Sequence, residues 1–380
     1  MKDFEDIRFY RDDEVQQALK ENIKHPMIKA LLQFTFPEKS FAEIEEITLG
    51  CTSIREFQTK VIYHSVQKVL ERSSEGLSYS GFDKLNKDKS YFYISNHRDI
   101  VLDTSLLNSA LYENDLVMTA SAIGDNLVQK PFLMLLSRLN RNFLVKRGLG
   151  PREMLRSSKN LSNYIKYLLL EEGRSVWMAQ REGRTKDGSD HTQQGVLKMI
   201  AMAKGDLSLT EYLKKLKIVP VAISYEFDPT DRLKMPEIMA KRMQETYVKS
   251  ANEDFNSIMQ GALGNKGRIH IGAGDILGDE VFDGIEKNAA SVNEQLQTIA
   301  TKIDEAVYRN YKLWPSNYIA CDLLNNSNTY SDRYSEKEKR QFERRISRRI
   351  DMKNALELNS YLLMYANPVI NKEALYEEKG

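Results

Sequence analysis

Apolar side chains in the first eighty residues recur every three or four positions, which is the spacing of one face of an α-helix. Asp12, Pro26, Ser40 and either Thr52 or Ser53 stand where such helices would begin, because these residue types favour the first turn. The longest stripe follows Ser53 and consists of Phe57, Val61, Ile62, Val66, Val69 and Leu70. The pattern therefore predicts a bundle of four amphipathic helices over residues 1–80.

From residue 81 the pattern changes to short apolar runs that alternate with helical stretches. The strands that we expect are 91–95, 116–120, 143–146, 175–179, 217–224 and 267–272. The helices that we expect between them are 103–111, 127–139, 151–172, 192–204 and 236–263. Alternation of this kind predicts an α/β fold with a mostly parallel central sheet flanked by helices, over residues 81–290.

The remainder, residues 291–380, again has a helical pattern and is expected to be a C-terminal helical extension. Ile299, Ile303, Val307 and Tyr311 form one stripe. Residues 331–352 are highly charged, with four arginines at 344, 345, 348 and 349. Such a stretch is most often a solvated helix face, and the alternative is a basic surface for anionic lipid or an acidic carrier.

Charge and cysteine content narrow the classes of function. The chain of 380 residues has 55 Lys and Arg against 54 Asp and Glu, a formal net charge of +1, so it has no global field that would attract nucleic acid. Cys51 and Cys321 lie far apart and match no metal spacing. The charged N-terminal stretch is not typical of a secretory signal, and no apolar run is long enough to span a bilayer. We expect a cytoplasmic protein, with peripheral contact to the inner face of the cell membrane as an option.

The strongest chemical signal is a histidine directly after the strand 91–95. His97 is followed by Asp99 at +2 and Asp103 at +6. An imidazole at a strand end can face a cleft while a carboxylate holds its other nitrogen, which is the arrangement of a general base. Asp99 is well placed to cap the next helix, so Asp103 is favoured as the orienting acid, with Asp99 as the alternative.

Two further polar groups follow predicted strands. Lys146 and Arg147 end the strand 143–146, where two cations can hold a phosphate. Glu182, Gly183 and Arg184 follow the strand 175–179 and place an acid, a flexible position and a guanidinium in one turn. Pro220 lies within an apolar strand, where it marks an edge, a bulge or a wall beside a site.

Taken in order, these four blocks resemble those of the glycerolipid acyltransferases, a superfamily that includes glycerol-3-phosphate and 1-acylglycerol-3-phosphate acyltransferases. The resemblance covers about residues 91–225. It implies that His97 deprotonates an acceptor hydroxyl for attack on an acyl thioester, and that Asp103 orients His97. It also implies that Arg98, Lys146, Arg147, Glu182, Gly183 and Arg184 bind substrate.

The chain departs from the family pattern at three points. The family has four residues between His and Asp, whereas five separate His97 from Asp103. Arg141 replaces the glycine of the second block. The third block lacks the residue that the family has between Gly and Arg, here Gly183 and Arg184.

The resemblance implies no metal and no cofactor, and a co-substrate that is a thioester of acyl-carrier protein or of coenzyme A. The acceptor would be glycerol 3-phosphate or 1-acylglycerol 3-phosphate, in phospholipid synthesis, and transfer would be direct. Two alternatives remain open. The acceptor could be an amine or a lipid without phosphate, or the chain could be a non-catalytic protein that binds lipid or carrier on the same fold.

Overall fold

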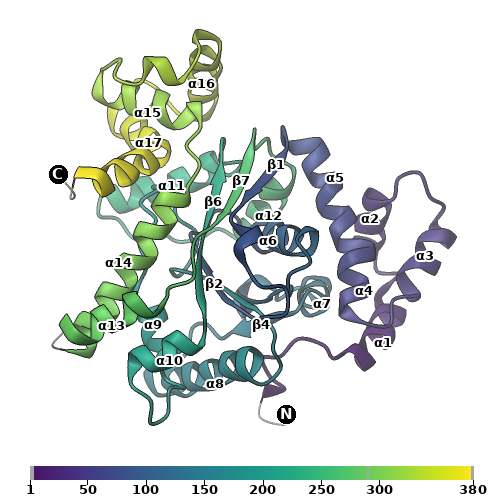
Figure 1. Ribbon diagram of the computed structural model, residues 1–380. Coiled ribbons are helices and arrows are strands. Elements are labelled where there is room, and N and C mark those ends of the chain that lie inside the picture. Colours follow the sequence, from purple (N-terminus) through teal and green to yellow (C-terminus); the bar gives the residue numbers. More distant parts are fainter. Residues whose placement is uncertain (1–3, 289–290, 378–380) are drawn as a thin grey trace.

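A seven-stranded sheet lies at the centre of the computed structural model, which describes residues 4–288 and 291–377 (Figure 1). The strands are β1 (Leu77–Ser80), β2 (Phe92–Ser95), β3 (Ala120–Gly124), β4 (Asn142–Val145), β5 (Val176–Ala179), β6 (Ile218–Tyr225) and β7 (Ile269–Ala273). Their order in the sheet is β1-β7-β6-β2-β5-β3-β4. Strands β2 to β6 are parallel to one another, while β7 is antiparallel to β6 and parallel to β1. This mostly parallel sheet, with helices on both faces, confirms the predicted α/β fold.

Two strands differ from the sequence prediction. The strand expected at 116–120 begins only at Ala120, because Leu116 packs into the core beside the preceding helix instead of entering the sheet. Strand β1 falls in a stretch that was expected to be helical. It is a short, half-buried edge strand of alternating polar and apolar residues, and its pairing with β7 decides its conformation.

Pro220 does not mark an edge, since β6 lies between β7 and β2 in the interior of the sheet. Pro220 pairs in register with Ile94 of β2, and its carbonyl accepts a hydrogen bond from the N–H of Gly274 at 2.8 Å. The nitrogen of a strand residue faces the same neighbour as its carbonyl, and the ladder with β7 starts only at Val221 and Ala273. Proline has no N–H to return a bond to Gly274, so it costs at most one hydrogen bond, at the end of the β6–β7 ladder.

The helices of the α/β part cover both faces of the sheet. They are α6 (Leu102–Glu113), α7 (Pro131–Leu139), α8 (Pro151–Leu170), α9 (Gln194–Ala201), α10 (Leu209–Lys215), α11 (Asp231–Arg242), α12 (Glu253–Leu263) and α13 (Asp279–Asn288). The helix expected at 236–263 is in fact two, α11 and α12, because Gln244 and Asn252 adopt left-handed backbone conformations between them. Helix α10 was not predicted.

Helices from both ends of the chain also complete the core of this fold. On one face, Val66 and Leu70 of α5 (Tyr63–Ser73) pack with the apolar side chains of α6. On the other face, Ile299 and Ile303 of α14 (Val292–Asn310) pack with those of α8, α9 and α10. The division into units 1–80, 81–290 and 291–380 stays a prediction, and its second boundary falls beside residues 289–290, which lie outside the described residues.

The remaining N-terminal helices are α1 (Asp12–Asn22), α2 (Pro26–Thr35), α3 (Phe41–Leu49) and α4 (Ile54–Phe57). Ser40 and Ser53 cap α3 and α4 through their side chains, as their positions in the sequence suggest. One π-helical turn, Gln58–Ile62, joins α4 to α5 and was not predicted. These helices share a core with Leu135 and Leu139 of α7, on the right of Figure 1.

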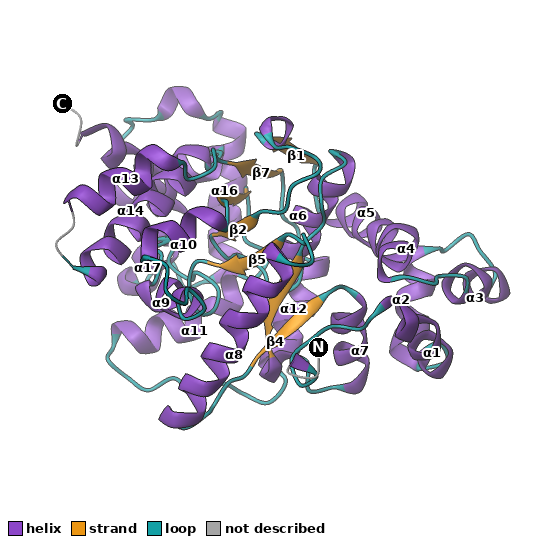
Figure 2. Ribbon diagram, turned by 60° about the horizontal axis from the view of Figure 1, so that its bottom comes forward, coloured by secondary structure: helices purple, strands orange, loops and turns teal. Residues whose placement is uncertain are grey.

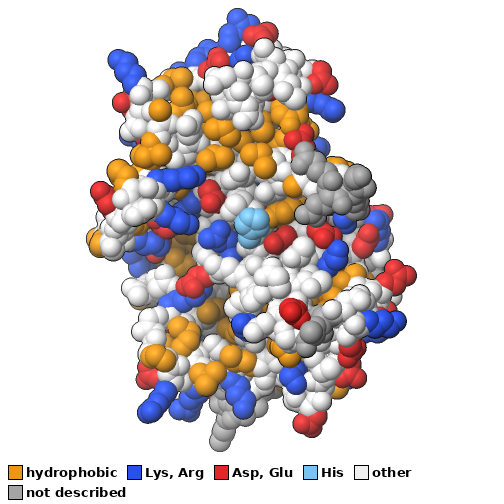
Figure 3. All heavy atoms as spheres, turned by 90° about the vertical axis from the view of Figure 1, so that its left-hand side faces the viewer, with side chains coloured by type: hydrophobic (Ala, Val, Ile, Leu, Met, Phe, Trp, Pro, Cys, Tyr) orange, Lys and Arg blue, Asp and Glu red, His pale blue; other side chains and the backbone are white. Residues whose placement is uncertain are grey.

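The last three helices, α15 (Pro315–Asn325), α16 (Glu336–Arg349) and α17 (Ala355–Glu377), form a core with Met235 and Ile238 of α11. Figure 2 shows α17 beside α11, and α17 also contacts α14 and α15. Side chains of both charges are scattered over the face in Figure 3, with apolar groups mostly in its upper part, in keeping with the balanced net charge. Across the described residues, no helix is both long and apolar enough to cross a membrane.

Candidate active site

The sheet topology brings the predicted polar groups to one edge. Strands β2, β5, β3 and β4 are adjacent and parallel, so their carboxyl ends lie side by side. His97 follows β2, Gln180 to Arg184 follow β5, and Lys146 and Arg147 follow β4. In open α/β sheets this edge is where ligands bind.

His97 is held by a carboxylate on one side. Its Nδ1 lies 2.8 Å from Oδ2 of Asp103, within a hydrogen bond. The ring packs edge-on against Trp177 of β5, with 5.8 Å between ring centroids, and the side chain is 14% exposed. Its Nε2 has no hydrogen-bond partner among the described residues. The imidazole is therefore fixed through one nitrogen and has the other available for a substrate proton.

Asp103 organises the whole turn after β2. Its Oδ2 also accepts hydrogen bonds from the backbone N–H groups of Arg98, at 2.7 Å, and Asp99, at 3.1 Å. The hydroxyl of Tyr225 donates to its other oxygen at 3.4 Å. The backbone from His97 to Asp99 therefore forms a turn around the buried Asp103 carboxylate. This turn accommodates the extra residue between His97 and Asp103.

Asp99 has the capping position that its place in the sequence predicts. Its Oδ1 accepts hydrogen bonds from the N–H groups of Val101 and Leu102, both at 2.9 Å, at the start of α6. Burial and the neighbouring Asp103 carboxylate raise the pKa of Asp99. Gly261 of α12 lies directly against this carboxyl group, and a Cβ there would overlap it. Of the two candidate acids, Asp103 is therefore the one in contact with His97.

Arg98 is placed differently from its expected role in substrate binding. Its side chain is 6% exposed, and its Nη2 lies 2.5 Å from Oδ2 of Asp190. Its guanidinium also lies over the ring of Tyr311. Burial alone would lower the pKa of Arg98, but the Asp190 carboxylate raises it above its ordinary value. This internal ion pair supports a structural role and leaves no support for contact with substrate.

Lys146 and Arg147 line an open groove of about 700 Å³ with residues of α7 and of the turn after β3. The Arg147 backbone N–H donates to Oδ1 of Asp125 at 3.1 Å, which fixes the end of β4. The Arg147 side chain is 35% exposed and its Nη1 donates to Oε1 of Glu182 at 2.6 Å. Because both partners are partly exposed, this ion pair contributes little to stability.

The third block forms the start of a long loop after β5. Gly183 has a left-handed backbone conformation, with φ of 69°, so the tight turn between Glu182 and Arg184 depends on glycine. Arg184 donates a long hydrogen bond, 3.4 Å, to the hydroxyl of Thr230, and has no carboxylate partner among the described residues. The next residue, Thr185, donates its backbone N–H to the carbonyl of His97 at 2.8 Å, so Arg184 lies near the turn that carries His97.

Two cations near Arg184 were not singled out from the sequence. Lys234 of α11 is buried and pairs with Asp228. Lys186 pairs with Glu237, and burial together with the neighbouring cations Arg184, Lys249 and Lys234 lowers the pKa of Lys186 to about 8. No local pattern marks Lys234, because helix α11 reaches the site only through the tertiary fold.

The arginine cluster of α16 is divided between two environments. Arg345 lies 2.8 Å from the buried carboxylate of Asp231, and Arg349 lies 3.5 Å from it. Arg344 and Arg348 are exposed and have no carboxylate partner in the described part of the chain. With Arg345, Arg349 and Gln341 they line a surface groove of about 460 Å³.

Comparison with known proteins places these features in a family context. Residues 76–224 match the family model described as Acyltransferase. No curated protein sequence matches the chain. A structure with a similar course is the 1-acyl-sn-glycerophosphate (LPA) acyltransferase PlsC from Thermotoga maritima, at 13% identity, with a TM-score of 0.36 over 78% of this chain and 93% of that chain. At this level the structural likeness is too weak to transfer any property.

Proposed function

The chain carries an Acyltransferase-family domain at residues 76–224, which confirms the resemblance in the sequence, and on this premise we propose that it is a glycerolipid O-acyltransferase. It would move a fatty acyl group from an acyl thioester to the hydroxyl of glycerol 3-phosphate or 1-acylglycerol 3-phosphate. The observation that carries the proposal is the His97–Asp103 pair at the sheet edge where Lys146 and Arg147 also lie.

His97 is the general base in this proposal. When Nδ1–H donates to Asp103, the lone pair of Nε2 can accept the proton of an acceptor hydroxyl. Asp103 is itself held by two backbone N–H groups, so the imidazole has one favoured tautomer and orientation. The Asp103 carboxylate also stabilises the imidazolium that forms once His97 has taken the proton.

The reaction balances without a covalent enzyme intermediate. The acceptor O–H bond breaks and its proton moves to Nε2 of His97, while the oxygen attacks the thioester carbonyl carbon. The C–S bond then breaks, and the thiolate leaves with the proton that His97 returns. Ester and free thiol are the products. The donor would be a thioester of acyl-carrier protein or of coenzyme A, and no further cofactor takes part.

Lys146, Arg147 and Arg184 would bind the acceptor phosphate. Arg147 is half exposed beside the groove, and its present partner Glu182 can be exchanged for a phosphate that accepts two parallel hydrogen bonds. Arg184 lacks a carboxylate partner and lies near the His97 turn. Lys146 and Arg147 supply positive charge at the same end of the sheet as His97, and Glu182 and Gly183 shape the turn that presents Arg184.

Replacement of Arg147 by alanine is expected to raise the KM for a phosphorylated acceptor by about ten- to hundredfold, the effect of losing hydrogen bonds to a charged group. The kcat should change little, because the reacting hydroxyl and His97 are untouched. Initial rates over a range of acceptor concentrations measure this. Arg152→Ala, an exposed arginine on α8, is the matched control. An equal loss with a monoacylglycerol, which has no phosphate, would contradict phosphate binding by Arg147.

The acceptor class itself is tested with pairs of compounds that differ only in phosphate. Purified protein is incubated with an acyl thioester and, separately, glycerol 3-phosphate, glycerol, 1-acylglycerol 3-phosphate, monoacylglycerol or an amino lipid, and the acylated products are identified by mass. Products from the phosphorylated member of a pair alone support the proposal. Products from the amine or the phosphate-free lipid alone would replace it with the other acceptor class.

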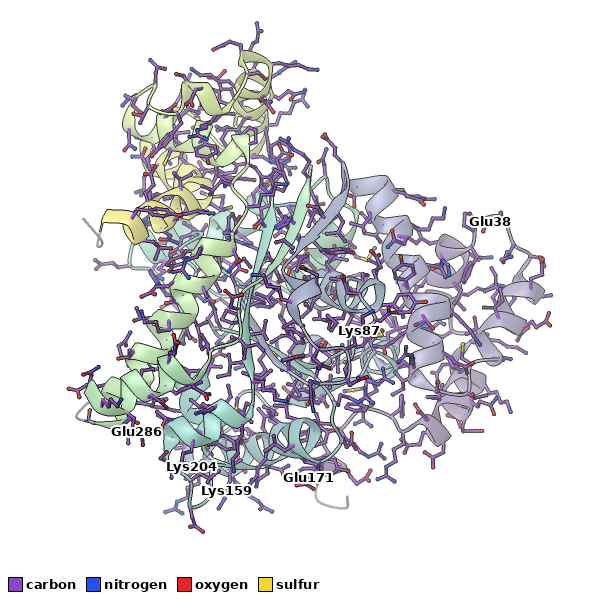
Figure 4. The ribbon with its side chains drawn as sticks, in the orientation of Figure 1. Glu38, Lys87, Lys159, Glu171, Lys204 and Glu286 are labelled. Atoms are coloured by element: carbon purple, nitrogen blue, oxygen red, sulfur yellow. The ribbon has the colours of Figure 1, made fainter. Side chains whose placement is uncertain are left out.

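Peripheral membrane contact would use the exposed arginines of α16. Each basic residue near an anionic surface contributes about 1 kcal/mol, so Arg344→Glu with Arg348→Glu should weaken binding to phosphatidylglycerol vesicles by about thirtyfold or more. Sedimentation with vesicles measures this, with phosphatidylcholine as the neutral comparison. The matched control is Arg152→Glu with Lys159→Glu on α8, at the opposite end of the molecule in Figures 1 and 4. If both double variants bind the vesicles equally well, α16 does not contact the membrane surface.

A further inference from the structure

The loop between β5 and α9, from Gln180 to Gln193, carries Glu182, Gly183 and Arg184 and has no helix or strand of its own. Long loops without regular structure need partners outside themselves to hold one conformation. Besides the Glu182–Arg147 and Lys186–Glu237 pairs, the loop has two groups of contacts, one toward the His97 turn and one toward the C-terminal helices.

The inner contacts tie the loop to the base. The Thr185 N–H donates to the carbonyl of His97 at 2.8 Å. Asp190 accepts from Arg98 at 2.5 Å and from the side chain of Asn96 at 3.2 Å. A movement of the loop at either position would therefore change the surroundings of His97 as well as the positions of Glu182 and Arg184.

The outer contacts come from α17 and from α14, where Asp304 accepts hydrogen bonds from the N–H and the hydroxyl of Thr192. On α17 the donors lie on one face of the helix. Asn367 donates from Nδ2 to the carbonyl of Asp187 at 2.6 Å, and Asn371 donates to the carbonyl of Ser189 at 2.9 Å. The two asparagines are four positions apart, so they lie one above the other on the helix. Tyr308 of α14 adds a third donor, to the Ser189 carbonyl at 3.1 Å.

Pro368, between the two asparagines, shapes the surface on which the loop rests. Proline has no N–H, so the carbonyl of Met364, four residues earlier, loses its helical hydrogen-bond donor. Gly188 lies directly against that carbonyl and against Pro368, and a Cβ at position 188 would overlap the Met364 oxygen. Gly188 also has φ of 76°, a conformation that other residues rarely adopt.

We propose that Asn367, Pro368 and Asn371 form a clamp on α17 that positions the loop 180–193 for binding of the acceptor. The clamp residues are positioning residues, since they touch the loop backbone and not the substrate. The C-terminal helical extension, which lies outside the family match, would then be a working part of the acceptor site. The effect on acceptor binding rests on the proposed function, whereas the ordering of the loop does not.

The test compares the double variant Asn367→Ala with Asn371→Ala against the matched control Asn359→Ala, an exposed asparagine on the same helix. Hydrogen–deuterium exchange of the amides from Thr185 to Asp190 should be about tenfold faster in the double variant, as expected for the loss of two hydrogen bonds. Acceptor KM should rise by about five- to thirtyfold with a small change in kcat. The thermal midpoint should stay close to that of the control, because the core of α17 against α15 is untouched.

Two further variants separate donation from packing. Asn367→Asp keeps the shape of the side chain but cannot donate, so its loop amides should exchange as fast as those of Asn367→Ala. Asn371→Gln retains a donor, so its loop amides should exchange more slowly than those of Asn371→Ala. Unchanged exchange in the double variant and in Asn367→Asp would overturn the clamp. Faster exchange with unchanged acceptor KM in an active protein would overturn its positioning role. If exchange is faster in the double variant but the parent protein has no acyltransferase activity, the clamp still orders the loop and only the proposed function is rejected.

Discussion

Replacing His97 by glutamine is expected to lower kcat for acyl transfer by about 10²- to 10⁴-fold, the range that a positioned general base contributes. The amide N–H of glutamine can still donate to Asp103, but glutamine cannot take up a proton at neutral pH. Acceptor KM should change little, because the proposed phosphate ligands follow other strands. The measurement is the rate of thiol release at saturating acceptor, together with the unfolding midpoint of each variant.

His64→Gln is the matched control for this substitution, since His64 is exposed on α5 and lies outside the sheet edge. Asp103→Asn should also lose most of the activity, because an amide can no longer hold the imidazole in one tautomer or stabilise its charge. Loss of activity of the same size in His64→Gln, or full activity in His97→Gln, would rule out His97 as the base.

Replacing Asp190 by alanine is expected to lower the free energy of unfolding by about 3–5 kcal/mol, the typical effect of leaving a buried charge without its partner. Arg98 is 6% exposed and Asp190 is its carboxylate partner at 2.5 Å. Burial raises the pKa of Asp190, although the positive charge of Arg98 opposes that shift. Urea unfolding of the purified variants measures the change.

The control for this prediction is Asp187→Ala in the same loop, whose carboxylate accepts hydrogen bonds from Ser189. Asp187→Ala should lower the free energy of unfolding much less than Asp190→Ala does. The double variant Arg98→Met with Asp190→Asn should recover much of the loss, because it leaves no buried charge without a partner. Asparagine can still accept from Asn96 and tolerates the left-handed backbone at position 190, where φ is 51°. If Asp190→Ala unfolds at the same urea concentration as the parent, the ion pair has no structural importance.

The fold and the first part of the site were predictable because they rest on short-range patterns. Apolar runs bounded by helical stretches gave the strands β2, β4, β5, β6 and β7 to within a few residues. A parallel sheet then places every strand's carboxyl end at one edge, so His97 and Arg147 could be expected to come together. Asp99 at a helix start gave a reason to prefer Asp103 as the partner of His97, and the observed 2.8 Å contact has that geometry.

The other parts depend on contacts between distant segments. Asp190 differs in no local way from Asp187, and only the fold brings Asp190 to Arg98. Strand β1 is half polar and forms because β7 lies beside it. Gly188 contacts Pro368 only because α17 packs against the loop, and nothing in the sequence around either residue indicates this contact. The π-helical turn at Gln58–Ile62 likewise has no signal in the apolar spacing.

The most direct test of the central claim is a time course of thiol release from a long-chain acyl thioester by the purified protein, with and without 1-acylglycerol 3-phosphate or glycerol 3-phosphate. Direct transfer at His97 predicts steady release that requires one of these acceptors, equals the ester formed, and has no initial burst in the acceptor's absence. Release that proceeds equally without acceptor, or no release with either acceptor, would contradict acyl transfer to a glycerol-phosphate hydroxyl.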